Sequence, residues 1–334
     1  MRIAFDTSRL EGPRTGIHRI VSSLLETSAA MQPDSTHEWI PIQRPDGIRS
    51  LAYLLHHLPK LAREAGADLI LSPHAWDFPG TSALPVVSML LDVWPWTHLD
   101  MTDPHAARHK ILQPFPRRAA GIIHISDFTR REFHELWPEC VVRDTVVPMS
   151  PGEHFTKEGS MAAEGIPEGE FFLGIASRDP RKNLPFLLDL VPRLNAPLVV
   201  VGDAPMEDVS GALHLGPCHD EMLGILYRRA KAFLYPSLYE GFGMPPTEAA
   251  KCGCPVLVSD LTSLPEVMGY DFPGMIPLGN GDRWAETANL LLRDDGARRK
   301  FIAAGDRVVA RYSWRKTFQG IEEFCGTMLE NPES

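Results

Sequence analysis

The stretch that decides the fold covers residues 235–266, Y-P-S-L-Y-E-G-F-G-M-P-P-T-E-A-A-K-C-G-C-P-V-L-V-S-D-L-T-S-L-P-E. Its two glutamates, Glu240 and Glu248, are separated by seven residues that include two glycines and two prolines. This order predicts a buried strand, a glycine loop, a short helix and then a second strand over residues 255–258. Because the helix begins directly after the loop, its first backbone amides suit an anion or a ring of hydroxyl groups.

Length and composition place this stretch in a large globular protein. The chain has 334 residues, enough for two domains, with 44% apolar and 23% charged residues. A net charge of −10 argues against general nucleic-acid binding.

The cysteine pattern and the length of the apolar segments indicate where in the cell the protein is expected. None of the five cysteines stands in a C-x-x-C pair, which favours reduced thiols in a cytosolic protein. The chain opens on the strand-like M-R-I-A-F-D, without a basic leader and a long apolar core, and its apolar runs fall short of the ~20 residues of a membrane helix. We therefore expect a cytoplasmic protein, either soluble or attached to the inner membrane only at its surface.

The N-terminal half opens like a Rossmann-like unit. A strand is expected over residues 3–5, a loop over 6–16 and a helix over 17–25, where apolar residues have helical spacing. The loop contains T-G-I-H rather than G-x-G-x-x-G, so no dinucleotide site is predicted. Gly16 could let the backbone approach a phosphate or a sugar, and the alternative is a plain turn.

Further strands are expected over residues 39–42, 69–72, 86–91, 122–126 and 141–147. Loops after consecutive parallel strands open on one edge of the sheet, where ligands of α/β folds bind. Aromatic, acidic and histidine residues on these loops are therefore candidates for a substrate site: His74, Trp76, Asp92, Trp94, Trp96 and His98. Taken singly, each is also compatible with a structural role, such as a tryptophan covering the edge of a core.

Basic residues gather between residues 105 and 131: Arg108, Lys110, Arg117, Arg118, Arg130 and Arg131. Two interpretations stay open, a solvated helix face or attachment to an anionic membrane surface.

The C-terminal half repeats the alternation of strands and helices. After a linker over residues 156–169, strands are expected over 171–176, 198–202, 211–215 and 233–236, and helices over 184–191 and 221–230. Three further helices are expected over 284–292, 297–309 and 314–329. Each half should therefore hold a parallel sheet with right-handed crossovers.

Cationic side chains follow the first strand of this second half. Arg178, Arg181 and Lys182 stand in one loop and suit a diphosphate, whose growing charge they would neutralise as it departs. Glu248 can accept from two vicinal hydroxyls, as on a ribose, and Glu240 from sugar hydroxyls. A pair of carboxylates also occurs in glycosidases, but cations for a diphosphate favour transfer from a nucleotide sugar over hydrolysis.

Several motifs carry a family resemblance. The segment E-G-F-G-M-P-P-T-E resembles the E-x7-E motif of retaining GT-B glycosyltransferases of family 4 type, the glycosyl transferases group 1. C-G-C-P-V-L-V-S-D and S-L-P-E-V-M-G follow in the family order, D-P-R-K-N-L-P-F-L-L is similar to the phosphate-binding region, and H-I-S-D-F-T-R-R-E-F resembles the end of the N-terminal domain. The resemblance covers nearly the whole chain and is most specific in the C-terminal half.

This resemblance implies the GT-B fold, with two Rossmann-like α/β domains that face each other across a cleft. Residues 1–155 would form the acceptor domain, completed by a returning helix over 314–329, and residues 156–312 the nucleotide-sugar donor domain.

The resemblance also implies roles for individual residues. Glu248 would hold the donor ribose, Glu240 the transferred sugar and Lys182 the phosphates. Backbone amides at Phe242, Gly243 and Met244 would reach sugar hydroxyls, and Gly216, Pro217 and Cys218 would border the nucleobase. The usual arginine partner of the lysine falls at Ser177, which leaves Arg178 and Arg181 as alternatives for the second phosphate position.

Two positions depart from the family pattern. Leu91 precedes Asp92 where many relatives carry a histidine that touches the transferred sugar, and His18 stands where a glycine is common. Both departures affect the prediction of the acceptor more than the prediction of transfer.

Together these features predict a retaining, metal-independent glycosyltransferase without a cofactor, acting in bacterial surface-polysaccharide assembly. It would transfer a hexose from a nucleotide sugar, with GDP-mannose as the first expectation, to a glycan or a lipid-linked glycan. The alternatives are a UDP-sugar or GDP-fucose as donor, or a non-catalytic binding or scaffold protein on the same fold.

Overall fold

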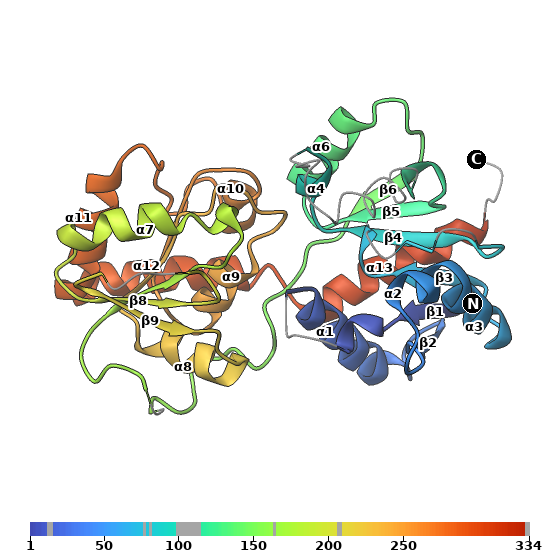
Figure 1. Ribbon diagram of the computed structural model, residues 1–334, viewed down its shortest axis with the longest axis horizontal. Coiled ribbons are helices and arrows are strands. Elements are labelled where there is room, and N and C mark those ends of the chain that lie inside the picture. The colour runs from blue at the N-terminus through green and yellow to red at the C-terminus, as the bar shows by residue number, and fades with distance from the viewer. Residues whose placement is uncertain are drawn as a thin grey trace. The chain divides into compact units, whose positions relative to one another are not determined.

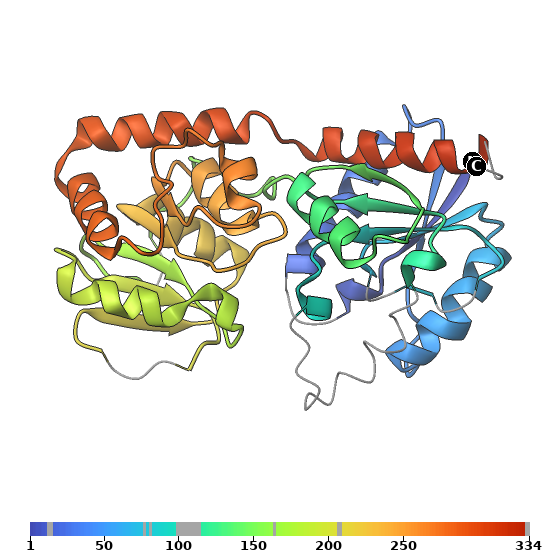
Figure 2. The same ribbon diagram turned by 90° about the horizontal axis from the view of Figure 1, so that it is seen from above.

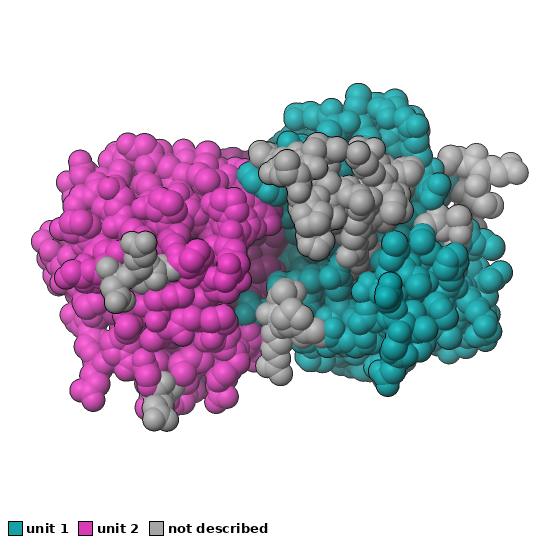
Figure 3. Space-filling model, in the orientation of Figure 1, with its two compact units in different colours: residues 1–149, 314–334 teal, residues 150–313 magenta. Residues whose placement is uncertain are grey.

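The computed structural model describes residues 1–11, 16–75, 78–79, 82–97, 115–162, 165–205 and 209–330. The chain forms two compact units (Figure 3): residues 1–149 with 314–334, and residues 150–313. We call them unit 1 and unit 2. Segment 150–155, which the sequence assigned to the N-terminal domain, belongs to unit 2 because Phe155 is fully buried there beside Tyr227, with ring centroids 5.9 Å apart.

Unit 1 is a six-stranded parallel sheet with the strand order β2-β1-β3-β4-β5-β6 (Figure 1). The strands are β1 (Arg2–Asp6), β2 (Glu38–Ile42), β3 (Leu69–Ser72), β4 (Val86–Leu90), β5 (Gly121–His124) and β6 (Arg143–Val146). The inner strands β3, β4 and β5 are buried along their whole length, as expected of a parallel sheet covered on both faces.

Helices connect these strands. The longer ones are α1 (Gly16–Met31), α3 (Leu58–Glu64), α6 (Asp127–Leu136) and α13 (Trp314–Glu330). Short helical turns are η1 (Ser8–Leu10), α2 (Ser50–Ala52), η2 (Tyr53–His57), α4 (Trp94–Thr97) and η4 (Phe115–Arg117). The helix α13 returns to unit 1 and packs against α1 and β5 (Figure 2), where Phe318, Ile321 and Cys325 are buried.

Unit 2 is a five-stranded parallel sheet with the order β11-β10-β7-β8-β9. The strands are β7 (Phe172–Ile175), β8 (Leu198–Val201), β9 (Ala212–Gly216), β10 (Ala232–Tyr235) and β11 (Val256–Val258). Its helices are η5 (Pro180–Lys182), α7 (Leu184–Leu190), η6 (Val191–Arg193), α8 (Asp220–Arg229), α9 (Met244–Lys251), α10 (Leu264–Met268), α11 (Gly281–Arg293) and α12 (Asp295–Val309). Separate apolar cores cover the two faces of the sheet, one around Phe233 and Tyr235 and one around Leu234 and Trp284.

The predicted fold class is confirmed, since each unit alternates parallel strands with helices. Among the described residues, no helix has the length and apolar composition that crossing a membrane requires.

Candidate active site

The candidate site lies where two neighbouring strands of unit 2 end. β7 and β10 pair in parallel, with Phe172 opposite Ala232, so the loops that follow them emerge on the same edge of the sheet. The loop after β7 carries Lys182, and the loop after β10 carries Glu240. Lys182 Nζ lies 2.6 Å from Glu240 Oε1, so the structure brings together two residues that are 58 positions apart.

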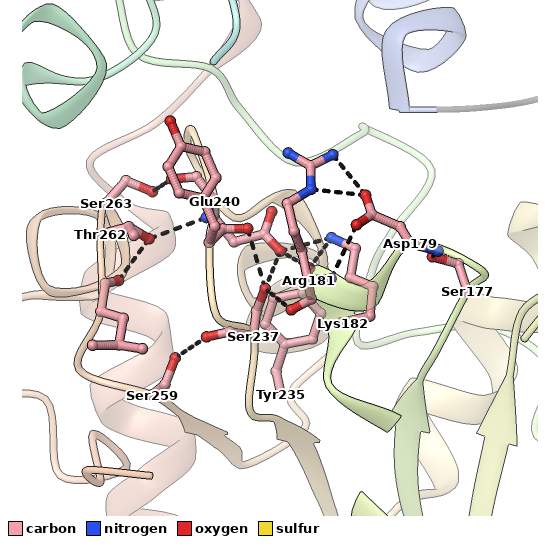
Figure 4. Close-up of polar contacts among 12 residues, drawn as sticks. Ser177, Asp179, Arg181, Lys182, Tyr235, Ser237, Glu240, Ser259, Thr262 and Ser263 are labelled. Carbon is pink, nitrogen blue, oxygen red and sulfur yellow. Dashed lines mark hydrogen bonds and ion pairs between the residues drawn. The ribbon is translucent and has the colours of Figure 1, made fainter. Parts of the chain in front are cut away.

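Three donors converge on this one carboxylate oxygen (Figure 4). Besides Lys182, the hydroxyl of Tyr235 and the hydroxyl of Ser237 each donate to Glu240 Oε1 at 2.6 Å. Lys182 Nζ also donates to Tyr235 Oη at 2.7 Å. The other oxygen, Oε2, accepts no hydrogen bond from the residues that the structure describes, and 11% of the Glu240 side chain stays exposed. The carboxylate is therefore held by one oxygen and open at the other.

The surroundings keep Glu240 ionised. Burial favours its protonated form, but the neighbouring ammonium group and the three hydrogen bonds outweigh burial, so the pKa of Glu240 lies below its usual value. Burial, and after it the Glu240 carboxylate, raise the pKa of Tyr235 well above its usual value. The Tyr235 hydroxyl therefore stays protonated and acts as a donor toward Glu240.

The backbone of Glu240 is held as well. Its amide donates to Thr262 Oγ1 at 3.0 Å, and its carbonyl accepts from Ser263 Oγ at 2.9 Å. Thr262 has a φ of 57°, a left-handed conformation that is costly for a β-branched residue. The loop after β11 thus holds the backbone of Glu240 through Thr262, a residue with a strained backbone conformation.

The loop after β7 separates the two candidate arginines. Arg181 pairs with Asp179 through Nε at 2.8 Å and Nη2 at 2.6 Å, and its guanidinium lies 5.9 Å from the Tyr239 ring. The side chain of Arg178 is 77% exposed and reaches Asp203 only at 3.8 Å. Arg181 therefore lies beside the Lys182–Glu240 pair, held by Asp179 (Figure 4). Arg178 extends into solvent. Ser177, which occupies the usual arginine position, accepts from the amide of Asp179 at 3.3 Å.

The glycine loop leads into α9 as expected. Gly243 has a φ of +98° directly before the helix, and a Cβ there would lie 2.7 Å from Leu264 Cδ2. Phe242 is buried against Tyr312, and Met244 is the first residue of the helix. The side chain of Glu248 is fully buried in α9, so its predicted contact with a ribose stays a prediction.

The predicted nucleobase border lies at the end of β9. Gly216 is the last residue of this strand and has a φ of +69°, Pro217 is exposed, and Cys218 is partly buried. Gly202 directly follows the neighbouring strand β8, and a Cβ there would lie 1.8 Å from Ala176 O. The sequence patterns do not indicate it as a site residue. Only a glycine lets these strand ends approach so closely.

The acceptor-side candidates lie in unit 1. Trp96 packs on the core with its ring 5.4 Å from Trp137, which supports the structural interpretation of this residue. The carbonyl of His74 accepts from Ser72 Oγ at 3.0 Å. Asp92 and Trp94 are half-buried and Gly16 is exposed at the start of α1, so their substrate roles stay predictions, as does the effect of Leu91. Trp76 and His98 lie outside the described residues.

The basic segment is only partly described. Arg117 pairs with Glu139 at 2.8 Å and Arg130 with Asp144 at 2.8 Å, so both have acidic partners within unit 1. Arg108 and Lys110 lie outside the described residues. Membrane attachment by this segment stays a prediction.

Sequence reasoning missed Tyr235, Ser237 and Thr262 as site residues. The first two stand within five positions of Glu240 and could have been found as polar residues at the end of an apolar strand. Thr262 is 22 positions away, and its part depends on a left-handed backbone conformation that no sequence pattern indicates. Among the described residues, no group of three or more His, Cys, Asp or Glu side chains is placed to hold a metal ion.

Comparison with known proteins finds a family match within unit 2. The model of the glycosyl transferases group 1 matches residues 156–308. O-antigen chain mannosyltransferase B of Escherichia coli is 34% identical over 224 residues, 58% of this chain and 57% of that protein. Phosphatidyl-myo-inositol mannosyltransferase of Mycobacterium leprae is 29% identical over 222 residues, 61% of this chain and 58% of that protein. The matches thus span less than two thirds of either relative.

The fold is also found among solved structures. Sucrose-phosphate synthase from Thermosynechococcus elongatus is similar with a TM-score of 0.79 over 99% of both chains, at 16% sequence identity. Likeness at this identity concerns the fold alone, and it confirms the predicted GT-B fold. Residues 156–308, which contain the whole cluster around Glu240, match the model of the glycosyl transferases group 1 family.

Proposed function

We propose that the protein is a retaining glycosyltransferase that transfers a hexose from a nucleotide sugar to a glycan or lipid-linked glycan in bacterial surface-polysaccharide assembly. The proposed donor is GDP-mannose, and the sugar transferred is mannose. The observation that carries the proposal is the contact of 2.6 Å between Lys182 Nζ and Glu240 Oε1, which places a cation for phosphate beside a carboxylate with one oxygen open. A transferase needs both groups together, because the bond that breaks joins the sugar to the diphosphate.

The proposed chemistry uses these two groups at the two ends of that bond. The C–O bond between the anomeric carbon and the diphosphate breaks, and the acceptor oxygen forms a new bond on the same face of the sugar. The acceptor proton passes to an oxygen of the departing diphosphate, so no side-chain base is required. Lys182 and Arg181 stabilise the charge that builds on the diphosphate, and Glu240 Oε2 accepts from a sugar hydroxyl.

The relatives support mannose as the sugar, since both named relatives are mannosyltransferases. The name of one relative contains a phospholipid, phosphatidyl-myo-inositol, which supports a lipid-linked acceptor. In this proposal the enzyme acts at the cytoplasmic face of the inner membrane. Co-sedimentation with anionic but not with neutral vesicles would support that location, and equal behaviour with both would contradict it.

The test of the function is transfer by the purified protein. Radiolabelled GDP-mannose, GDP-fucose, UDP-glucose and UDP-galactose are each supplied with a lipid-linked glycan acceptor, and the anomeric configuration of the product is read by NMR. We expect α-linked mannose from GDP-mannose, and unchanged turnover in EDTA because side chains neutralise the diphosphate.

Each other result changes the proposal in a defined way. Transfer from another nucleotide sugar would correct the donor, and a β-linked product would contradict retention. Nucleotide binding in a thermal-shift panel without any transfer would indicate a binding or scaffold protein.

A further inference from the structure

Strand β10 ends in a tyrosine whose position in the core does not require a hydroxyl group. Tyr235 is fully buried, and its ring stacks on Phe233 with centroids 5.4 Å apart. A phenylalanine would pack in the same place. Burying a hydroxyl costs free energy unless it makes hydrogen bonds, and here its two partners are both charged.

The Tyr235 hydroxyl accepts a hydrogen bond from Lys182 and donates one to Glu240. Lys182 Nζ donates to Tyr235 Oη at 2.7 Å, and Tyr235 Oη donates its own proton to Glu240 Oε1 at 2.6 Å. An ammonium group has three N–H donors. Two of them are used by Tyr235 and Glu240, which leaves the third for a ligand.

We propose that Tyr235 is a positioning residue for the transfer reaction. Its hydroxyl holds Lys182 and Glu240 together, so that Glu240 Oε2 faces the sugar while the third N–H of Lys182 is available to the diphosphate. This inference rests on the proposed function, because it assigns the two open positions to the two halves of a nucleotide sugar.

The arrangement also explains why Lys182 alone would not be sufficient to hold the Glu240 carboxylate in place. A bound diphosphate attracts Lys182 and weakens its contact with Glu240. Tyr235 and Ser237 would then still donate to Oε1, so that the carboxylate keeps its orientation and its charge. Neutral donors therefore protect the sugar-facing carboxylate from competition for its cation.

Removing the hydroxyl should raise the pKa of Glu240. Among the described residues, Lys182 is in direct contact with this carboxylate, and the Arg181–Asp179 ion pair lies in the same loop as Lys182. The hydrogen bonds lower the pKa of Glu240 against the effect of burial, so losing one donor lets protonation begin at higher pH. The acid limb of the rate profile should move to higher pH.

The experiment compares Tyr235→Phe with Tyr227→Phe. Tyr227 is also fully buried and packs on Phe233, with ring centroids 5.2 Å apart, but its hydroxyl makes no hydrogen bond to Glu240. Both variants are checked for folding by circular dichroism and assayed with GDP-mannose across the acid limb. For Tyr235→Phe we expect kcat to fall about tenfold, the loss of one hydrogen bond to a charged group, with KM changed much less and the acid limb displaced upward. Tyr227→Phe should match the wild type.

A readout without turnover tests the same contact. NMR titration of the Glu240 carboxyl carbon in the ligand-free protein should give a higher pKa in Tyr235→Phe than in the wild type. An unchanged Glu240 titration, or an equal loss of kcat in Tyr227→Phe, would overturn the inference.

The two proposals fail in distinguishable ways. A wild-type protein that neither binds nor turns over GDP-mannose contradicts the proposed donor, whereas the titration still decides whether Tyr235 acts on Glu240. An active wild type with an unaltered Tyr235→Phe contradicts the positioning role alone.

Discussion

Glu240 stays charged in a nearly closed environment because three donors meet on one of its oxygens. Burial alone would protonate a carboxylate, and the ammonium group of Lys182 alone could leave for a phosphate. The combination of a cation with two neutral hydroxyls avoids both outcomes. The position of the negative charge on Glu240 therefore does not depend on a single hydrogen-bond partner.

Replacing the lysine should affect turnover more than folding. In Lys182→Ala we expect kcat to fall by about 10²-fold or more, the typical effect of removing one group that stabilises charge in the transition state. Lys231→Ala is the matched control, because Lys231 pairs with Glu170 at 2.7 Å in the same unit and away from the site. Steady-state kinetics with GDP-mannose checks this, and unaltered turnover in Lys182→Ala would remove the leaving-group role.

Glu248, the second glutamate of the motif, is either a ribose-binding residue or a structural residue, and one variant distinguishes the two roles. If Glu248 holds the ribose, Glu248→Gln should weaken GDP binding by about 1.5–3 kcal/mol, measured by calorimetry, as for a lost charged hydrogen bond. Glu286→Gln, on the exposed face of α11, serves as the control. Because Glu248 is fully buried, the rival outcome is a lower unfolding temperature with unchanged GDP affinity, which would make it a structural residue.

At the scale of elements, the site depends on how the loops leave the ends of β7, β8 and β10. Parallel pairing puts these strand ends on one edge of the sheet, where the loops that follow them can contribute side chains to the same site. The loop after β7 contributes cations and the loop after β10 contributes the carboxylate. The geometry therefore follows from the sheet order β10-β7-β8 rather than from proximity in the sequence.

The two arginines of the β7 loop should differ in effect. Arg181 is held by Asp179 and lies beside Lys182, whereas Arg178 is largely exposed, where solvent screens its charge. We expect Arg181→Ala to weaken GDP binding about tenfold by calorimetry, which corresponds to ~1.4 kcal/mol, and Arg178→Ala to change it less than about twofold. The opposite order would assign the second phosphate position to Arg178.

The close approach of β7 and β8 limits substitution at Gly202. Its φ is +123°, and a Cβ would lie 1.8 Å from the carbonyl oxygen of Ala176. Gly202→Ala should therefore lower the free energy of unfolding by at least about 2 kcal/mol and displace the loop that carries Lys182. Gly169→Ala, where a Cβ meets open space, is the control in denaturant unfolding. Similar stability of the two variants would contradict the close approach.

At the scale of the whole molecule, each unit has its own core, and the last helix belongs to the first unit. Phe318 of α13 is 1% exposed and its ring centroid lies 4.7 Å from that of Trp39. Trp284 of α11 is fully buried in unit 2. The chain therefore completes unit 1 only after unit 2 has been traversed.

A matched pair of core variants tests this division. Phe318→Ala and Trp284→Ala should each cost about 3–5 kcal/mol, the usual range for truncating a buried aromatic residue. In hydrogen exchange, we expect Phe318→Ala to lower protection in β1 to β6 and Trp284→Ala to lower it in β7 to β11. Equal loss in both sheets from either variant would contradict two separate cores.

The sequence by itself determined the alternation of strands and helices, the two Rossmann-like units and the motif pair at Lys182 and Glu240. Apolar runs and glycine or proline breaks specify such elements locally, because they depend on spacing along the chain. Only the tertiary structure decided that Tyr235 and Ser237 share one oxygen of Glu240, that Thr262 holds its amide, and that Arg181 rather than Arg178 lies beside it. These features depend on which strands become neighbours and on how closely their loops approach, and residue spacing does not encode either.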